Sequence, residues 1–444
     1  MRRKAIAACI AAAVLPLSAA ACSSAASGSG SSGTGSDYTV NWWTWDPNQA
    51  AAYEQCIPGF EKAHPGIRVQ VSQYDVNDYF TKLTADFVAG NAPDAFQDSL
   101  LTDVGELQPL NSYLSSGQLN QYSVGVSSVK GPDGQPYGLP MDWATAAMYY
   151  NESAVKQAGL TEQQIQNMTW NPVNGGTFEK IVAHLTIDDN GVRGDQPGFD
   201  KNRVKQYGIG VLDAADFSGQ TSWFPFAAST GWTMRGPWAT SFSYDNPKFI
   251  QTMDWVKKLV ADGYSPSFNQ STLSDSQLVG SGKVAMTVGG SWEATTFAAL
   301  PGVKVGIAPT VDGPVGRRSI NNSNMNVMWQ GSKDKQATFA WMSYQESAAC
   351  QTKAATYNGS FFPSISSSMN ALVSYEQTKG VDLSVFTQQR DQGELIDQVP
   401  AKNWTEIGNN LNPIFEAYFL GEKNDSVWQQ ADQVSAQSIA GTAP

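Results

Sequence analysis

The sequence predicts an α/β fold with a mainly parallel sheet, and two observations at the start of the folded chain support this fold class. Two short apolar runs, residues 38–43 and 67–72, have the length of strands, and in the second run Ile67, Val69 and Val71 alternate with polar residues. A segment with helical character follows each run. Strands that alternate with helices indicate a mainly parallel sheet covered by helices on both faces.

The first strand is followed by Asp46-Pro47-Asn48, a combination that breaks a strand and starts a helix. Pro58 should kink this helix or end it early, because proline has no N–H for the helical hydrogen bond. The predicted apolar face of the helix consists of Tyr53, Cys56, Ile57 and Phe60, which repeat at helical spacing.

A second helix is predicted over residues 77–89, and Gly90-Asn91 ends it. The next short strand begins at residues 93–96, where Asp94 is expected to have a structural role. Later elements follow from the same kinds of signal. They are an extended or mixed segment over 137–150, helices over 155–159, 177–185, 249–263, 335–357 and 409–418, and a buried strand over 284–288.

The first 21 residues have the pattern of a secretory signal peptide. Arg2, Arg3 and Lys4 form a positive patch, and a short apolar run to Ala21 follows it. This run is too short and too interrupted for a good spanning helix, which needs about 20 apolar residues. Residues 1–21 are therefore predicted to direct export.

Cys22 is the predicted lipidation site. The segment Ala19-Ala20-Ala21-Cys22 resembles the bacterial lipobox, although Ala19 stands where a large aliphatic residue is usual. Residues 23–36 contain only Ser, Gly, Ala and Thr, so residues 22–36 are predicted to form a flexible tether from the membrane to the folded body. The alternative is an ordinary signal peptide, cleaved near Ala21, with no lipid on Cys22.

Charge and composition exclude several classes of function. The chain of 444 residues has a net charge of −12, and loss of the three basic groups in residues 1–21 makes the mature protein more acidic still. An acidic body argues against nucleic acid and against binding flat on an anionic lipid surface. The two histidines, His64 and His184, stand alone in the sequence, so neither a metal site nor a cofactor is expected.

A series of motifs is spread along almost all of the mature chain. The motifs are Phe60–Val69, Ala89–Asp94, Tyr137–Pro140 with Tyr149–Asn151, Gly282–Met286 with Gly290–Trp292, and Ala340–Trp341 with Gly359–Pro363. In this order they resemble the extracytoplasmic solute-binding proteins of ABC transporters, in the sugar-binding group related to maltose-binding protein. The resemblance implies a type II periplasmic-binding-protein-like fold, in which a hinge of three crossings joins two α/β lobes that close on a ligand. By this resemblance lobe one covers 37–143 plus 309–362, and lobe two covers 144–308 plus 363–444.

Two of the four cysteines remain once the signal peptide and the lipid site are set aside. Cys56 and Cys350 would meet an oxidising compartment, which suggests one disulfide. The resemblance places both cysteines on helices of lobe one, so the bond is possible and is predicted. The alternative is two separate buried thiols.

Candidate ligand contacts are aromatic side chains for the apolar faces of a sugar and polar side chains for its hydroxyl groups. Some follow predicted strands at the sheet edge where open α/β folds bind ligands. Others are placed by the resemblance at the crossings or after the Gly289-Gly290 turn. The candidates are Trp45, Asp46, Asp98, Asp142, Trp143, Trp223, Phe224, Trp292, Glu293 and Asn322.

Each candidate has a structural alternative. An aromatic side chain can belong to the core, and a carboxylate can cap a helix or lie in a solvated loop. Trp292 favours the ligand role, because Gly-Gly-Ser-Trp interrupts an apolar pattern. The acidic residues from Asp188 to Asp200 surround a glycine as in a calcium loop, but no Glu closes the pattern, and a plain polar loop is the favoured alternative.

The resemblance implies a binding protein rather than an enzyme. We expect a monomer, lipid-anchored to the outer face of the cell membrane, that captures a carbohydrate and delivers it to ABC permease subunits. A secreted glycoside hydrolase is an alternative, since 40 acidic residues always allow a pair of carboxylates at catalytic spacing. A surface lectin is a third hypothesis. The sequence does not name the sugar.

Overall fold

The computed structural model describes residues 37–442, apart from 102, 235, 237, 271, 360 and 399. The predicted signal peptide, the lipid site at Cys22 and the tether lie outside the described residues. In the described part of the chain, no helix has both the length and the apolar character that a membrane span requires.

The first sheet combines parallel and antiparallel strands. Its order is β13-β4-β12-β3-β1-β2, with β14 beside β12. β1 pairs in parallel with both β2 and β3, as predicted, whereas β12 runs antiparallel to β3 and β4. The strands are β1 (Tyr38–Thr44), β2 (Ile67–Gln73), β3 (Ala95–Asp98), β4 (Gly138–Ala144), β12 (Ser319–Met328), β13 (Phe362–Pro363) and β14 (Leu395–Asp397).

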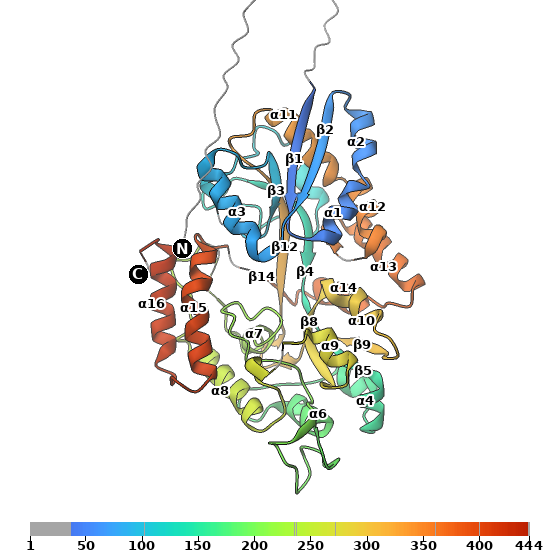
Figure 1. The fold of residues 1–444 in the computed structure, drawn as a ribbon, viewed down its shortest axis with the longest axis vertical. Helices are drawn as coiled ribbons and strands as arrows, with labels where there is room; N and C mark the ends of the chain where they lie inside the picture. Colours follow the sequence, from blue (N-terminus) through green and yellow to red (C-terminus); the bar gives the residue numbers. More distant parts are fainter. Residues whose placement is uncertain are drawn as a thin grey trace, which may run out of the picture. The chain divides into compact units, whose positions relative to one another are not determined.

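Helices cover both faces of this sheet, and Figure 1 shows α3 on one side of β1 and α1 and α2 on the other. Trp42 and Trp43 are neighbours in β1 and therefore point to opposite faces. Trp42 packs with the core that contains Tyr53 and Trp341, and Trp43 packs with the core that contains Tyr79. The helices are α1 (Pro47–Glu54), α2 (Ile57–Ala63), α3 (Val76–Ala89), α11 (Lys335–Gln345), α12 (Ala348–Asn358) and α13 (Ser366–Thr378).

The second sheet is antiparallel and has the order β8-β5-β9. Only Thr145 separates β4 of the first sheet from β5 of the second, so the chain crosses from one sheet to the other at this residue. The strands are β5 (Ala146–Asn151), β8 (Met286–Gly290) and β9 (Val305–Ala308).

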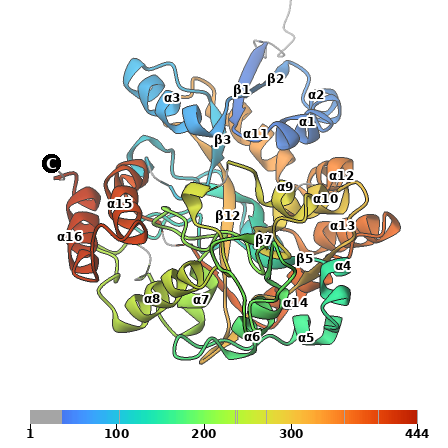
Figure 2. The same ribbon diagram turned by 60° about the horizontal axis from the view of Figure 1, so that its bottom comes forward.

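Most of the remaining helices surround the second sheet, and Figure 2 shows several of them together around β5 and β7. α15 and α16 pack against each other. The helices are α4 (Glu152–Gln157), α5 (Glu162–Gln166), α6 (Gly176–Leu185), α7 (Phe224–Ser229), α8 (Pro247–Ala261), α9 (Asp275–Gly280), α10 (Ala294–Ala298), α14 (Ser384–Asp391), α15 (Trp404–Phe419) and α16 (Val427–Ile439). Two short ribbons, β6 (Ile187–Asp188) with β7 (Val204–Gln206) and β10 (Asp312–Gly313) with β11 (Gly316–Arg317), and four single-turn 3₁₀ segments complete the elements.

Two predicted helices are each divided in the structure. The helix around Pro58 ends at Glu54 and restarts as α2, with Pro58 in the first turn, where a missing N–H is harmless. The helix predicted over 335–357 is two helices, because the Ser347 side chain accepts a hydrogen bond from the Cys350 N–H and starts α12 anew.

The predicted disulfide is confirmed. Cys56 and Cys350 are bonded, with alpha carbons 5.7 Å apart, and the bond joins the junction of α1 and α2 to α12. Since 294 residues separate the two positions, the crosslink connects the start of the described chain to a late helix.

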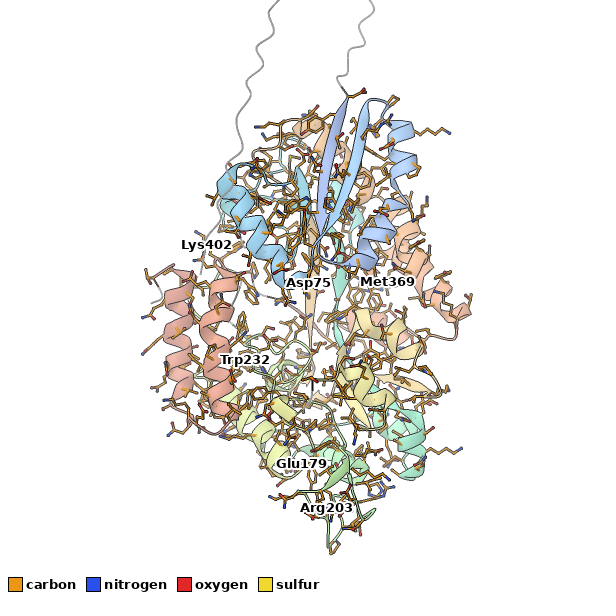
Figure 3. All side chains as sticks on the ribbon, viewed as in Figure 1. Asp75, Glu179, Arg203, Trp232, Met369 and Lys402 are labelled. Carbon is orange, nitrogen blue, oxygen red and sulfur yellow. A yellow bond between two sulfur atoms is a disulfide. The ribbon has the colours of Figure 1, made fainter. Side chains whose placement is uncertain are left out.

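The lobe boundaries remain predictions. Met369 of α13, labelled in Figure 3, and Leu372 belong to the core that also contains Trp42 and Trp341. α13 also contacts α12 and β13, a strand of the first sheet, which favours a later boundary than residue 362.

Candidate ligand-binding site

Several predicted site residues come together at one end of the first sheet. In the register of the sheet, Asn324 of β12 lies opposite Asp142 of β4, and the next residue, Met325, lies opposite Asp98 of β3. β1 pairs with β3 at Trp43 and Phe96, so the chain leaves β1 at the same end of the sheet. The polar residues at the ends of β1, β3 and β4 are therefore neighbours in the sheet, although they are far apart in the sequence.

Asp142 is the best-anchored carboxylate of this group. It is 1 % exposed, its Oδ2 accepts a hydrogen bond of 2.5 Å from Gln49 Nε2, and its Oδ1 accepts one of 2.7 Å from Asn324 Nδ2. The register of β4 against β12 shifts at Asn324 and Met325, an irregularity of the kind that re-aims side chains. Burial raises the pKa of Asp142 to about 7, against the two hydrogen bonds, and the Asp46 carboxylate raises it further.

Asp46 caps α1. Its Oδ1 accepts hydrogen bonds from the N–H groups of Asn48, at 2.7 Å, and Gln49, at 3.3 Å. Burial raises the pKa of the Asp46 carboxyl, and these hydrogen bonds oppose that shift. The structural alternative for Asp46 is therefore present. The cap also sets the start of α1, which places Gln49 against Asp142.

Trp45 and Asp98 lie beside α3. Trp45 is half-buried, with ring centroids 5.3 Å from Tyr79 and 5.5 Å from Phe80. Asp98 is 3 % exposed, and its Oδ1 accepts hydrogen bonds from the N–H groups of Ser99 and Leu100. Burial raises the pKa of Asp98 to about 6. These two residues thus have different neighbours from Asp142, which lies beside α1.

Trp292 is the exposed aromatic candidate, with 39 % of its surface accessible. It follows β8 in a single turn, Ser291–Glu293, and a Cβ atom on Gly290 would collide with its ring, so glycine allows the ring to lie on the backbone. The Gly290 N–H donates to Glu293 Oε2 at 3.1 Å, and the Tyr149 hydroxyl donates to the Gly290 carbonyl at 2.8 Å. Trp292 is therefore presented on a rigid turn.

Glu293 supports this turn. Burial raises the pKa of Glu293 to about 7, and the Asp275 carboxylate raises it further, while the hydrogen bond from Gly290 opposes the shift. The side chain thus holds the turn that carries Trp292.

Thr145 ties the Trp292 turn to the crossing between the sheets. The Ser291 N–H donates to the Thr145 carbonyl at 2.8 Å, and the Thr145 N–H donates to Ser291 Oγ at 3.2 Å. Thr145 Oγ1 also donates to Ser319 Oγ, at 2.7 Å, at the start of β12. In the sequence, Asp142 precedes Thr145 by three residues, and Trp292 follows Ser291 directly. Both candidates therefore lie close to the same crossing.

Three aromatic candidates are buried, which favours the alternative that they belong to the core. Trp143 is 1 % exposed and packs edge-on against Phe362. Trp223 is 0 % exposed and Phe224 is 4 % exposed. Both pack against Trp232, which Figure 3 labels. Polar neighbours in the sequence did not distinguish these rings from ligand-facing ones.

Asn322 and two residues that the sequence analysis missed complete the polar group. Asn322 lies opposite Ala144, and its Oδ1 is buried without a hydrogen-bond partner. Gln49 and Asn324 were not predicted, although both hold Asp142. The available signals were the position of Gln49 in the first turn after the Asp46 cap and the alternation of Asn322, Asn324 and Asn326 along one strand.

The acidic loop after Asp188 uses its carboxylate internally. Asp188 accepts hydrogen bonds from the N–H groups of Asn190, Val192 and Asp200, at 2.8–3.0 Å. These bonds favour a plain polar loop. Within the residues that the structure describes, no group of three or more His, Cys, Asp or Glu side chains is placed to hold a metal ion.

Known proteins resemble the chain over most of its length. A binding protein of Brucella abortus (strain 2308) is 23% identical over 395 residues, which are 85% of this chain and 87% of that protein. UspC of M. tuberculosis superposes with a TM-score of 0.74 at 24% identity, over 90% of this chain and 100% of that chain. The cyclic alpha-maltosyl-1,6-maltose binding protein of Arthrobacter globiformis superposes with a TM-score of 0.74 at 17% identity, over 92% and 100%.

These superpositions show the type II periplasmic-binding-protein fold, as expected from the sequence. The family model described as bacterial extracellular solute-binding protein matches residues 55–382, which is well over half of the chain. The protein is therefore a member of the bacterial extracellular solute-binding protein family.

Proposed function

We propose that the protein is the substrate-binding lipoprotein of an ABC importer, and that it captures a sugar or oligosaccharide next to the Thr145 crossing. One observation carries this proposal. An exposed indole, Trp292, and a hydrogen-bonded polar group around Asp142 lie close to the same crossing, on different sheets. A flat apolar ring and a set of polar atoms are what a saccharide in water requires.

The chemistry of the two sides is complementary to a sugar. The Trp292 ring offers an aromatic face for the C–H face of a pyranose. Asp142, Gln49 and Asn324 offer oriented hydrogen-bonding groups for hydroxyls. A buried hydroxyl without a partner costs about 1–3 kcal/mol, so such a group selects ligands by the positions of their hydroxyls.

The comparisons support the sugar class. The Arthrobacter protein is named for the oligosaccharide that it binds, and it shares this fold over nearly its whole length. We propose the same broad class of ligand here and leave the particular sugar open. Trp45, Asp98, Glu293 and Asn322 remain proposed contacts in a state closed on ligand.

Membership of an extracellular family places the protein outside the cytoplasm. We propose that a lipid on Cys22 holds it at the outer face of the membrane and that it works as a monomer. Ligand binding would stabilise a closed form, since only that form contacts the ligand from both lobes. Permease subunits would then receive the closed form. The protein itself would carry out no reaction.

A thermal-shift screen tests the proposal. Mature protein is heated with a panel of mono- and oligosaccharides and, in parallel, with peptides and polyamines. At least one saccharide should raise the melting temperature by mass action. A shift with a peptide or polyamine and with no sugar would refute the sugar class. Release of a chromophore from aryl glycosides would instead show a hydrolase.

A further inference from the structure

The polar group around Asp142 has unpaired oxygen atoms. Gln49 is 3 % exposed and donates its Nε2 to Asp142, while its Oε1 is buried and has no partner. Asn324 does the same, since its Nδ2 donates to Asp142 and its Oδ1 is buried without a partner. While Asp142 is ionised it accepts only, so both amides must turn their nitrogens toward it and keep their oxygens free. The group therefore lacks hydrogen-bond donors.

Among the described residues, the carboxyl groups of this polar group have no paired cation. Gln49 connects Asp46 to Asp142, because its N–H donates to Asp46 Oδ1 at 3.3 Å and its Nε2 donates to Asp142 Oδ2 at 2.5 Å. Among the described residues, no ion pair includes either carboxylate. Arg390 is a candidate counterion. Its Nε pairs with Asp391 at 2.8 Å, its Nη1 is buried without a hydrogen-bond partner, and its guanidinium carbon lies 5.9 Å from the centre of the Trp143 ring.

The protein interior behind Asp142 adds another acid. Glu346 is 0 % exposed and accepts hydrogen bonds from Asn326, at 3.3 Å, and Gln351, at 2.9 Å. Burial raises the pKa of Glu346, and Asp142 contributes to the rise, while the hydrogen bond from Gln351 opposes it. Asp142 thus lies among acids and amides, and none of the ion pairs in the described part of the chain includes it.

We infer that this group selects saccharides that carry a protonated amine, with the ammonium near Asp46 and Asp142 and the amide oxygens of Gln49 and Asn324 as further acceptors. An ammonium supplies three donors and the missing positive charge in one group. Its hydrogen bonds to carboxylates are stronger than those of a neutral hydroxyl. A uronic acid would place another acid in the same place. This inference rests on the proposed function, because it specifies the ligand of that same site.

Titration calorimetry with matched sugars tests the inference on the mature protein. The probes are D-glucosamine, D-glucose, N-acetyl-D-glucosamine and D-glucuronate, together with the corresponding galacto sugars. In at least one series the amino sugar should bind at least tenfold more tightly than the sugar with a hydroxyl on the same carbon. The N-acetyl sugar, which keeps the nitrogen and loses its charge, should lose this advantage. The uronate should bind most weakly.

Variants locate the effect. Asp46→Asn removes one charge and keeps a good helix cap, and Asp142→Asn removes the other at nearly constant shape. Each should lower the preference for the amino sugar at least threefold. Glu54→Gln is the matched control, since it removes an exposed charge from the same helix and should leave the preference unchanged. Circular dichroism establishes whether each variant is folded. If Asp142→Asn does not fold, the test rests on Asp46→Asn alone.

The outcomes separate this inference from the function on which it rests. A neutral sugar bound as tightly as its amino counterpart overturns the inference and leaves the proposed function in place. Folded variants that keep the full preference also overturn it. If no saccharide of any kind binds, the proposed function fails, and the inference fails with it.

Discussion

Thr145 and Ser291 exchange two backbone-mediated hydrogen bonds, and this pair joins the crossing between the two sheets to the turn that carries Trp292. The Ser291 N–H donates to the Thr145 carbonyl, and the Thr145 N–H donates to the Ser291 hydroxyl. Asp142 lies three residues before Thr145, so these hydrogen bonds connect the two sides of the proposed site through the crossing.

Gly290→Ala should weaken ligand binding by displacing Trp292. The added Cβ would collide with the indole ring, and the ring is free to move because one side of it is exposed. We expect at least a tenfold loss of affinity for the best saccharide, measured by calorimetry. Gly105→Ala is the control, since a Cβ there meets nothing within 4 Å. Unchanged affinity in Gly290→Ala would show that the position of the ring does not matter.

Asp142 should make the protein less stable as the pH rises toward neutrality. Its pKa is about 7 in the folded protein, against about 3.9 for an unperturbed aspartate, so between these values the folded state binds more protons than the unfolded state. The free energy of unfolding contributed by this group therefore falls from about pH 4 to about pH 7. Thermal melts across this range in wild type and Asp142→Asn measure the effect.

The variant should show a smaller loss of melting temperature than wild type between pH 5 and 7, while the exposed control Glu54→Gln should follow wild type. Identical pH profiles for wild type and Asp142→Asn would contradict the raised pKa. Asp98 and Glu293 also have raised pKa values, and they contribute to the pH dependence of wild type and variant alike. The difference between the two pH profiles therefore reports on Asp142.

Loss of the Cys56–Cys350 bond should destabilise the folded protein. Removing a native disulfide frees the unfolded chain and typically costs about 2–5 kcal/mol in small secreted domains. Urea unfolding of wild type and of Cys56→Ser/Cys350→Ser should show this difference as a lower midpoint. Mass spectrometry of non-reduced protein should find no free thiol at either position, and two free thiols would contradict the bond.

The predicted lipid on Cys22 has its own test. Cells that express the protein are labelled with a radioactive fatty acid, and the protein is recovered from membrane and medium. Wild type should carry label and remain with the membrane, whereas Cys22→Ala should carry none and appear in the medium. An unlabelled wild-type protein in the medium would indicate an ordinary signal peptide instead.

The sequence predicted the fold well where local patterns and packing agree. The alternation of Ile67, Val69 and Val71 identified β2, and the strand–helix order gave the parallel pairing with β1. α13 was missed, because Ser366-Ser367-Ser368 is a poor helical start, and its contact with α12 stabilises it. The sequence could not show that contact.

The candidate site was only partly predictable. Gly289-Gly290 was predicted to be a turn, but both glycines are the last residues of β8, and the turn that carries Trp292 follows them. Gln49 and Asn324 were not predicted, because their roles depend on hydrogen bonds to a residue far away in the sequence. Gln49 is 93 positions from Asp142, and Asn324 is 182 positions from it. Trp223 could not be distinguished from a ligand contact, because the sequence shows only that a tryptophan is present. It does not show whether the ring packs in the core or faces a ligand.

The most direct test of the proposed function is calorimetric titration of the strongest saccharide from the thermal-shift screen into wild type and Trp292→Ala. Trp292 is partly exposed and is not part of the hydrophobic cores, so the protein should still fold without its ring. We predict a folded variant with at least a tenfold weaker affinity. A folded Trp292→Ala protein that binds the saccharide as tightly as wild type would contradict the site and the mechanism built on it.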